Sequence, residues 1–184
     1  IVCPYDAELF GHWWFEGPQW LESLFRQVAA LAHRPFSFIS PSEYLEMYPV
    51  NQPATPCMST WGSNGYNEVW LDGANDWIYR HLHHAAAEMI QMANRHPAAE
   101  GIMLRALNQA ARELLVAQSS DWAFIMKTGT MVEYAVNRTK KHLLNFWQLQ
   151  EAIQKNEFEE EKVKNLEEAN NIFPDLNYRV FASR

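Results

Sequence analysis

Three long stretches of helical apolar spacing constrain the fold more than any other feature of the sequence. They cover about residues 75–94, 98–118 and 131–154, and each repeats apolar side chains every three or four positions. A helix with one apolar face must pack that face against another element, so these segments predict a helical bundle. The acidic run 157–161 opens a fourth helix, which Pro174 ends, because carboxylates suit the positive end of a helix dipole.

The first 39 residues follow a different pattern, which starts with a short apolar run that ends at Asp6. Its β-branched residues are typical of a packed strand, and Pro4 indicates that the strand ends nearby. Apolar spacing then predicts a helix from Trp20 to about His33, and Phe36–Ile39 has the composition of a short second strand. A lone strand leaves backbone groups unpaired, so we expect its partner strands in a missing, preceding part of the protein.

Two segments connect this region to the predicted bundle. Ser40 and Glu43 have the spacing of a capping box, which predicts a short helix over residues 44–47. Residues 49–73 are rich in proline, glycine and asparagine and predict a long loop. Long loops in compact domains are usually functional or disordered, and Trp61 and Trp70 favour a functional loop here.

Charge and cysteine content exclude several classes of partner. The net charge is −7 and no basic stripe is present, so we expect no nucleic acid to bind. No apolar run is long enough to span a bilayer, so we expect no membrane partner. Cys3 and Cys57 fit neither a disulfide framework nor a zinc spacing, which indicates buried thiols in a reducing, cytoplasmic compartment.

A histidine cluster and several helical tryptophans have structural interpretations. His81 and His84 share one helix face, but no adjacent cysteine or aspartate completes a metal-ligand set. We therefore expect neither a metal nor a cofactor. Trp77 and Trp147, like the other tryptophans at helical positions, are expected to pack in the core.

Asp6 is the strongest catalytic candidate, because it directly follows the predicted strand. Acids at the carboxyl ends of barrel strands are commonly catalytic, and a carboxyl group beside indole rings can hold a proton near neutral pH. His12, Trp13 and Trp14 follow within one short segment, and their flat rings match the apolar faces of pyranose sugars. The alternative is an aspartate that only caps the next turn.

Two segments resemble conserved motifs of a known enzyme family. DAELFGHWW, residues 6–14, resembles the fourth motif of glycoside hydrolase family 57, in the form found in its 1,4-α-glucan branching enzymes. STWGSNGYNEVWL, residues 59–71, resembles the fifth motif, and the resemblance continues to the C-terminus. Ser63 stands where many members carry a glutamate, so no role of that carboxylate is transferred to this chain.

The resemblance implies a mainly α fold, in which a helical bundle follows the last strand and helix of a (β/α)7 barrel. Residues 1–39 would be the last section of the catalytic barrel, whose remainder is missing from this chain. Residues 40–184 would form the helical C-terminal domain that carries the aromatic substrate loop 59–71.

The resemblance also implies roles for individual residues. Asp6 would be the general acid/base of a retaining enzyme. Trp13 would line the cleft beside the scissile bond, and His12 would lie next to it or directly behind it. Trp61 and Trp70 would place aromatic rings over the donor or acceptor glucan.

The implied function is that of a retaining 1,4-α-glucan branching enzyme of glycogen biosynthesis, with amylose or a glycogen-like polymer as partner. The family's nucleophile is a glutamate of its third motif, upstream of Asp6, so we expect the chain to be inactive alone. One alternative is an α-amylase or 4-α-glucanotransferase of the same family. The other is a non-catalytic helical module that binds glucan or docks on a separate barrel.

Overall fold

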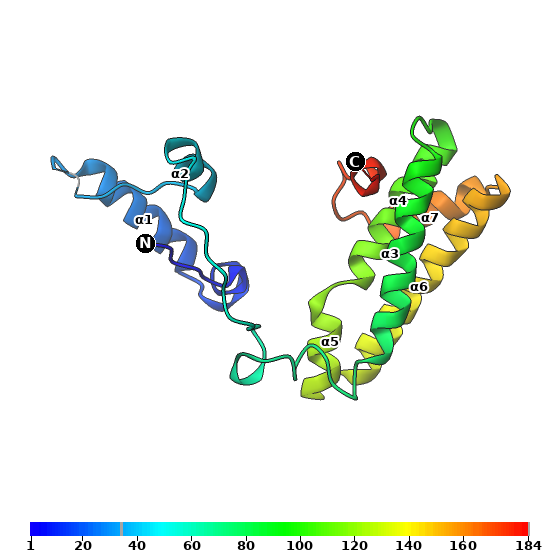
Figure 1. Ribbon diagram of the computed structural model, residues 1–184, viewed down its shortest axis with the longest axis horizontal. Helices are drawn as coiled ribbons and strands as arrows, with labels where there is room; N and C mark the ends of the chain where they lie inside the picture. Colours follow the sequence, from blue (N-terminus) through cyan, green and yellow to red (C-terminus); the bar gives the residue numbers. More distant parts are fainter. Residues whose placement is uncertain (34, 184) are drawn as a thin grey trace. The chain divides into compact units, whose positions relative to one another are not determined.

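The computed structural model describes residues 1–33 and 35–183. The chain divides into two compact units, residues 1–56 and 57–184, and each is considered by itself (Figure 1). Every regular element of the described residues is a helix. This confirms the predicted mainly α fold.

The second unit is a bundle built around α4 (Gly101–Ala117). This helix packs against α3 (Trp77–Arg95), α6 (Val132–Lys155) and α7 (Glu160–Ala169). The short helix α5 (Ser120–Thr128) lies against α6, and the 3-10 turn η3 (Tyr178–Phe181) lies against α3 and α4. Figure 1 shows that α3 and α6 run in the same direction, with α4 running in the opposite direction.

The central position of α4 follows from its small apolar residues. Alanines let neighbouring helices approach closely, and the interaxial distance depends on the side chains at the contact. The fully buried apolar residues of α4 are Ala106, Leu107, Ala110, Ala111, Leu114 and Ala117. The three long predicted helices are confirmed as α3, α4 and α6. The predicted fourth helix, α7, ends at Ala169 and does not extend to Pro174.

A buried carboxylate lies inside the bundle. One Glu113 oxygen accepts hydrogen bonds from Gln109 (2.8 Å) and Asn170 (2.7 Å), and the other accepts from His142 Nδ1 (2.7 Å) and Asn145 (3.0 Å). Burial raises the pKa of Glu113, but these hydrogen bonds together outweigh burial and lower the pKa. The Glu113 cluster, defined by these five residues, thus joins α4, α6 and the residue after α7 through an ionised group.

The first unit contains a π-helical turn η1 (Leu9–Trp13), α1 (Gly17–Ala30) and α2 (Pro41–Met47). The capping box before α2 is confirmed: the Ser40 hydroxyl accepts from the Glu43 amide at 3.2 Å, and the Glu43 carboxylate accepts from the Ser40 amide at 2.6 Å. These bonds satisfy backbone donors that the first turn of a helix leaves unpaired, which fixes the start of α2.

Two predictions for the first unit and one for the cysteines are wrong. Residues 1–6 and Phe36–Ile39 form no strand, because the described residues offer them no neighbouring strand for ladder hydrogen bonds. Cys3 and Cys57 are exposed thiols and are not buried. Their segments have no regular structure, so nothing in their own unit covers them.

Helix α1 keeps the predicted apolar spacing but exposes most of it. Trp20, Phe25 and Leu31 are 43%, 50% and 46% exposed, whereas Val28 is buried. The helix therefore has an apolar face that its own unit covers only in part.

Among the described residues, none of the helices combines the length and the apolar character that a membrane crossing requires.

Candidate functional site

Asp6 lies at the start of a tight turn that carries two of the other predicted site residues. Its side chain is exposed, and its backbone carbonyl accepts a hydrogen bond from the Leu9 amide at 3.2 Å. The following π-helical turn places the His12 and Trp13 rings 5.7 Å apart, and the Trp13 side chain is 76% exposed. Such π-helical turns occur frequently at functional sites.

A row of aromatic rings holds this turn against α1. The ring centroids of Tyr5 and Phe10 are 5.7 Å apart, those of Phe10 and Trp14 5.9 Å, and those of Trp14 and Trp20 5.4 Å. Gly17 allows this packing, because a Cβ atom there would lie 3.0 Å from Phe10 and 3.2 Å from Trp14. The row therefore orders the segment after Asp6 while its neighbours His12 and Trp13 stay accessible.

The second group of predicted site residues lies on a loop that closes on itself. The Thr60 amide donates to the Gly65 carbonyl at 2.7 Å, and the Thr60 hydroxyl donates to the Tyr66 carbonyl. The same hydroxyl accepts from the Gly62 amide at 2.9 Å. Asn64 and Gly65 adopt left-handed backbone angles, with φ of 54° and 79°, as a turn of this tightness requires.

Contacts with α3 and α5 anchor the end of this loop. The Tyr79 hydroxyl donates to the Trp70 carbonyl, and burial raises the pKa of Tyr79. The Trp70 and Phe124 rings lie 6.3 Å apart. Asn75 is fully buried and donates to the carbonyls of Val69 (2.9 Å) and of the residue before Phe124 (3.0 Å). The backbone around Trp70 is thus fixed from two sides.

An ion pair completes the anchor. Lys127 of α5 lies 2.7 Å from the Asp72 carboxylate, and Asp72 also accepts from the Ala74 amide at 3.1 Å. Both hydrogen bonds lower the pKa of Asp72, the one from Lys127 most. This anchoring leaves Trp61 84% exposed and Tyr66 54% exposed. The loop therefore offers aromatic rings that no packing role requires, and flat rings can stack on the apolar faces of a ligand.

The predicted site residues fall into two groups. Asp6, His12 and Trp13 belong to the first unit, and Trp61 and Trp70 belong to the second. Each group is ordered by contacts within its own unit. Three residues that order the loop were not among the predicted site residues: Thr60, Asn75 and Tyr79. The sequence does contain turn signals at two of these positions. Thr60 stands two residues before Gly62, and Asn75 follows Asp72-Gly73-Ala74, and both patterns are typical of turns.

The predicted histidine cluster provides no ligand set. The described residues contain no group of three or more His, Cys, Asp and Glu side chains that could hold a metal ion. His81 instead lies against Trp77, with ring centroids 6.3 Å apart, and His84 lies against Trp147 at 4.7 Å.

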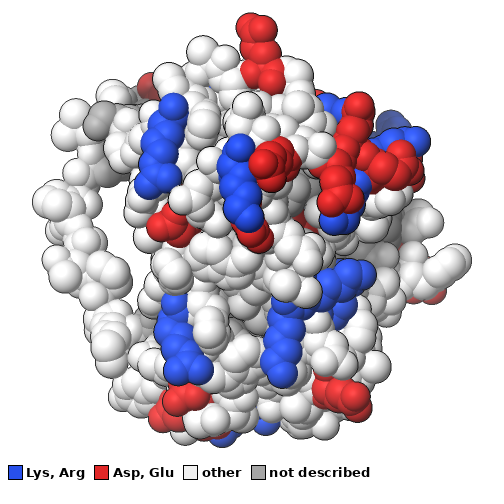
Figure 2. Space-filling model, turned by 90° about the vertical axis from the view of Figure 1, so that its right-hand side faces the viewer, with Lys and Arg blue, Asp and Glu red and all other residues white. Residues whose placement is uncertain are grey.

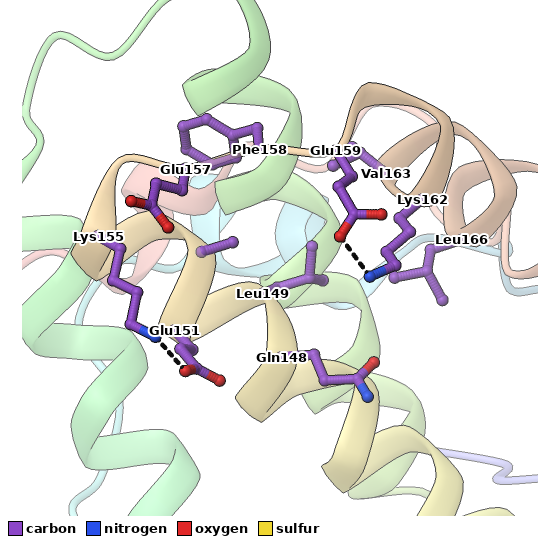
Figure 3. A pocket seen from close by; sticks show the side chains of 11 residues that line it. Gln148, Leu149, Glu151, Lys155, Glu157, Phe158, Glu159, Lys162, Val163 and Leu166 are labelled. Carbon is purple, nitrogen blue, oxygen red and sulfur yellow. Dashed lines mark hydrogen bonds and ion pairs between the residues drawn. The ribbon is translucent and has the colours of Figure 1, made fainter.

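A groove of about 340 Å³ lies between the end of α6 and the start of α7 (Figure 3). Its lining is partly apolar, with Leu149, Phe158, Val163 and Leu166 among its residues. Figure 3 shows the ion pairs Lys155–Glu151 and Lys162–Glu159, both at 2.5 Å, along this groove. Each pairs charges from neighbouring positions along the chain, and the groove contains none of the predicted site residues.

The charges on the face of the molecule drawn in Figure 2 are mixed. Lys and Arg side chains lie among Asp and Glu side chains on this face. Opposite charges in alternation give no extended basic surface, which phosphate backbones require for strong binding.

Gly62 offers a test of the loop geometry. A Cβ atom at Gly62 would lie 2.2 Å from the Tyr66 carbonyl oxygen and 2.9 Å from the Thr60 hydroxyl, so Gly62→Ala must open the loop. We expect limited proteolysis within residues 57–76 to become about tenfold faster, as the loss of about 1.4 kcal/mol of local stability implies. Gly73→Ala is the matched control, because open space surrounds Gly73. Equal cleavage rates for both variants would contradict the loop geometry.

Comparison with known sequences identifies relatives of this chain. Residues 81–181 match the family described as 1,4-alpha-glucan branching enzyme, C-terminal. A 1,4-alpha-glucan branching enzyme of Thermococcus kodakarensis is 34% identical over 178 residues, which cover 94% of this chain and 26% of that protein. A probable 1,4-alpha-glucan branching enzyme of Mycobacterium tuberculosis is 32% identical over 157 residues, covering 77% of this chain and 28% of that protein.

Three solved structures match this chain over its whole length. The alpha-amylase AmyC from Thermotoga maritima is 42% identical with a TM-score of 0.68, and the match covers 100% of this chain and 33% of that one. The GH57 branching enzyme of Thermococcus kodakaraensis, solved with glucose, is 32% identical with a TM-score of 0.72, covering 100% and 34%. The GH57-type branching enzyme of Pyrococcus horikoshii is 30% identical with a TM-score of 0.74, covering 100% and 35%.

Proposed function

The chain belongs to the family of C-terminal regions of 1,4-alpha-glucan branching enzymes of glycoside hydrolase family 57, and from this membership we propose that it is the C-terminal part of a retaining branching enzyme. The observation that carries the proposal is 34% identity over 94% of the chain to a branching enzyme. The chain spans only 26% of that relative's length, so the activity proposed here is that of a longer protein.

We divide the chain into a barrel section, residues 1–39, and a helical domain, residues 40–184. The boundary at residue 39 comes from the resemblance, since the compact first unit extends to residue 56. Helix α1 supports a barrel section within this unit, because Trp20, Phe25 and Leu31 form an apolar face that the unit leaves largely exposed. A helix face with three large exposed apolar side chains suits packing against the remainder of a barrel. That remainder would also remove Asp6 from water and supply the second carboxylate.

In the proposed reaction, Asp6 acts first as an acid and then as a base. Its carboxyl group protonates the glycosidic oxygen while a carboxylate about 5–5.5 Å away attacks the anomeric carbon and forms a glycosyl-enzyme. The 6-oxygen of an incoming sugar then attacks the anomeric carbon and displaces the enzyme carboxylate, while the Asp6 carboxylate accepts the proton of that hydroxyl, and an α-1,6 linkage results. The exposure of Asp6 at the start of the turn, with His12 and Trp13 close behind, supports this role.

The aromatic residues would favour transfer over hydrolysis. Trp61 is 84% exposed on a loop that internal hydrogen bonds hold in place, so its ring can cover an acceptor glucan without a change in the fold. Trp70 is anchored through its carbonyl and would line the same glucan path. Exclusion of water from the glycosyl-enzyme leaves the sugar hydroxyl as the nucleophile that reacts.

Trp61→Ala should therefore raise the share of hydrolysis in the full-length protein, because water can reach the glycosyl-enzyme once the ring is removed. The measurement is the ratio of new reducing ends to new α-1,6 linkages formed from amylose. Met58→Ala is the control, since Met58 is 75% exposed directly before loop 59–71 and has no proposed role. An unchanged ratio in Trp61→Ala would count against an acceptor-side role for this ring.

An α-amylase is the second candidate function, and the 42% identity to the Thermotoga maritima alpha-amylase favours it. Incubation of the full-length protein with amylose separates the two candidates. A branching enzyme produces α-1,6 linkages with few new reducing ends, whereas an amylase produces reducing ends alone. A 4-α-glucanotransferase of the same family would change chain lengths without either product accumulating.

For the 184-residue chain alone we propose glucan binding without turnover. The proposed mechanism needs a nucleophile, and the resemblance assigns none to the segment that follows Asp6. We further propose a cytoplasmic location, because a reducing compartment preserves exposed, unpaired thiols such as those of Cys3 and Cys57. A role in glycogen biosynthesis is proposed from the family membership.

A further inference from the structure

Two of the tryptophans expected in the core line a surface seam between the parallel helices α3 and α6. Trp77 and Trp147 are only partly buried and pack against the core from one side. On their outer side lie polar neighbours: Lys140 Nζ is 5.8 Å from the centre of the Trp77 ring, and the His84 and Trp147 ring centroids are 4.7 Å apart. The α3–α6 seam is defined here as these four residues together with His81.

The surroundings of these indoles differ from those of a core tryptophan. Trp122 is 8% exposed, and its Nε1 donates to the Val116 carbonyl at 2.7 Å. Within the part of the chain that the structure describes, Trp77 and Trp147 make ring contacts, and neither indole N–H donates a hydrogen bond. Buried tryptophans usually satisfy this donor, so the two seam indoles keep a donor and part of a ring face free for a ligand.

The register of the two helices pairs an indole of one helix with a basic side chain of the other at two levels along the seam. The Trp77–Lys140 and His84–Trp147 contacts lie seven residues apart on both helices, which is about 10 Å at 1.5 Å per residue. This rise along the helix axes exceeds one pyranose ring, so one sugar chain running along the seam could meet the Trp77 and Trp147 levels with different sugar units. His81 lies between them and contacts the Trp77 ring edge to face.

We propose that the α3–α6 seam is a second contact surface for an α-glucan chain, in addition to loop 59–71. The inference rests on the proposed function, which supplies the class of ligand. The two indoles stack on the apolar faces of non-adjacent sugar units. The exposed His81, His84 and Lys140 side chains then reach the hydroxyl groups at the edges of those units.

The test uses the 184-residue chain and its retardation by amylopectin in native gels. Trp77→Leu and Trp147→Leu keep apolar contact with the core but remove the flat ring. We expect each to raise the apparent Kd for amylopectin about tenfold, which equals about 1.4 kcal/mol. Lys140→Ala alters only an exposed side chain and should raise the apparent Kd about threefold, because exposed hydrogen bonds contribute less.

Trp61→Leu is the matched control, since it removes an exposed indole from the loop and not from the seam. If the seam variants and Lys140→Ala bind like the unaltered chain while Trp61→Leu binds less, the seam inference is wrong and the proposed function stands. If the unaltered chain is not retarded at all, the seam inference and the proposed glucan binding by this chain alone are both wrong, whereas the branching activity is tested separately in the full-length protein with amylose. A change in subunit association without a change in retardation would assign the seam to protein contacts and overturn the inference.

Discussion

Asp6→Asn in the full-length protein is expected to lower the rate of branching by about 10²–10⁴-fold, the usual contribution of a positioned general acid. Asparagine has the same shape as aspartate but can neither protonate the leaving oxygen nor accept a proton from the acceptor. Because only the backbone carbonyl of Asp6 is engaged in the turn, and asparagine can keep that bond, we expect the substitution to leave the turn intact. Glucan binding should change little, since no binding contact is assigned to this carboxyl group.

Glu8→Gln provides the matched control for this substitution. Glu8 lies two residues away in the same exposed segment and has no assigned role. The measurement is the rate of formation of α-1,6 linkages from amylose at saturating substrate. Near-native turnover in Asp6→Asn, or an equal loss in Glu8→Gln, would contradict the assignment of the acid to Asp6.

Glu113→Ala is expected to destabilise the helical bundle by about 3–5 kcal/mol, the cost of breaking a buried charged cluster. The substitution removes the shared acceptor of four buried side chains, Gln109, His142, Asn145 and Asn170, of which Gln109 keeps its second hydrogen bond to the Leu166 carbonyl. A domain is usually stable by only about 5–15 kcal/mol, so this loss removes a large part of the total. Urea unfolding followed by circular dichroism measures the effect. Glu151→Ala is the control, since its ion pair with Lys155 is exposed and should matter little.

The same cluster predicts how stability depends on pH. The pKa of Glu113 is lower in the folded chain than in the unfolded one, so the unfolded state binds more protons. The stabilisation is complete above the unfolded pKa of this group and is lost as the pH falls through its folded pKa. Acid should therefore weaken the unaltered bundle more than Glu113→Ala, measured as the free energy of unfolding. Parallel acid profiles for the two proteins would contradict the role of Glu113.

Local rules predicted the helices of this chain but not its N-terminal segment. The helices α3, α4 and α6 follow from apolar periodicity, and the start of α2 follows from a capping box between Ser40 and Glu43. A strand depends instead on a neighbour, and Ile1–Asp6 has none among the described residues. Its strand-like composition therefore did not produce a strand here.

Tertiary packing decided the features that the sequence analysis missed. Glu113 and Gln109 lie four residues apart on the buried face of α4. The other hydrogen-bond donors to Glu113 come from α6 and from Asn170 after α7, so they depend on how the helices pack. Trp77 and Trp147 satisfy the spacing of core residues, yet the parallel α3–α6 register leaves both partly exposed. The two site segments were found through motifs, whereas the hydrogen bonds that order loop 59–71 depend on Tyr79 and Phe124 of neighbouring helices.

The most direct test of the central claim is the chemical rescue of Asp6→Ala in the full-length protein. With an α-maltosyl fluoride donor, whose leaving group needs no protonation, the first step no longer requires an acid. The account predicts that this variant forms the glycosyl-enzyme, that added azide accelerates its turnover, and that the product is an α-linked glycosyl azide. No acceleration by azide, or a product of inverted configuration, would show that Asp6 is not the acid/base of a retaining enzyme.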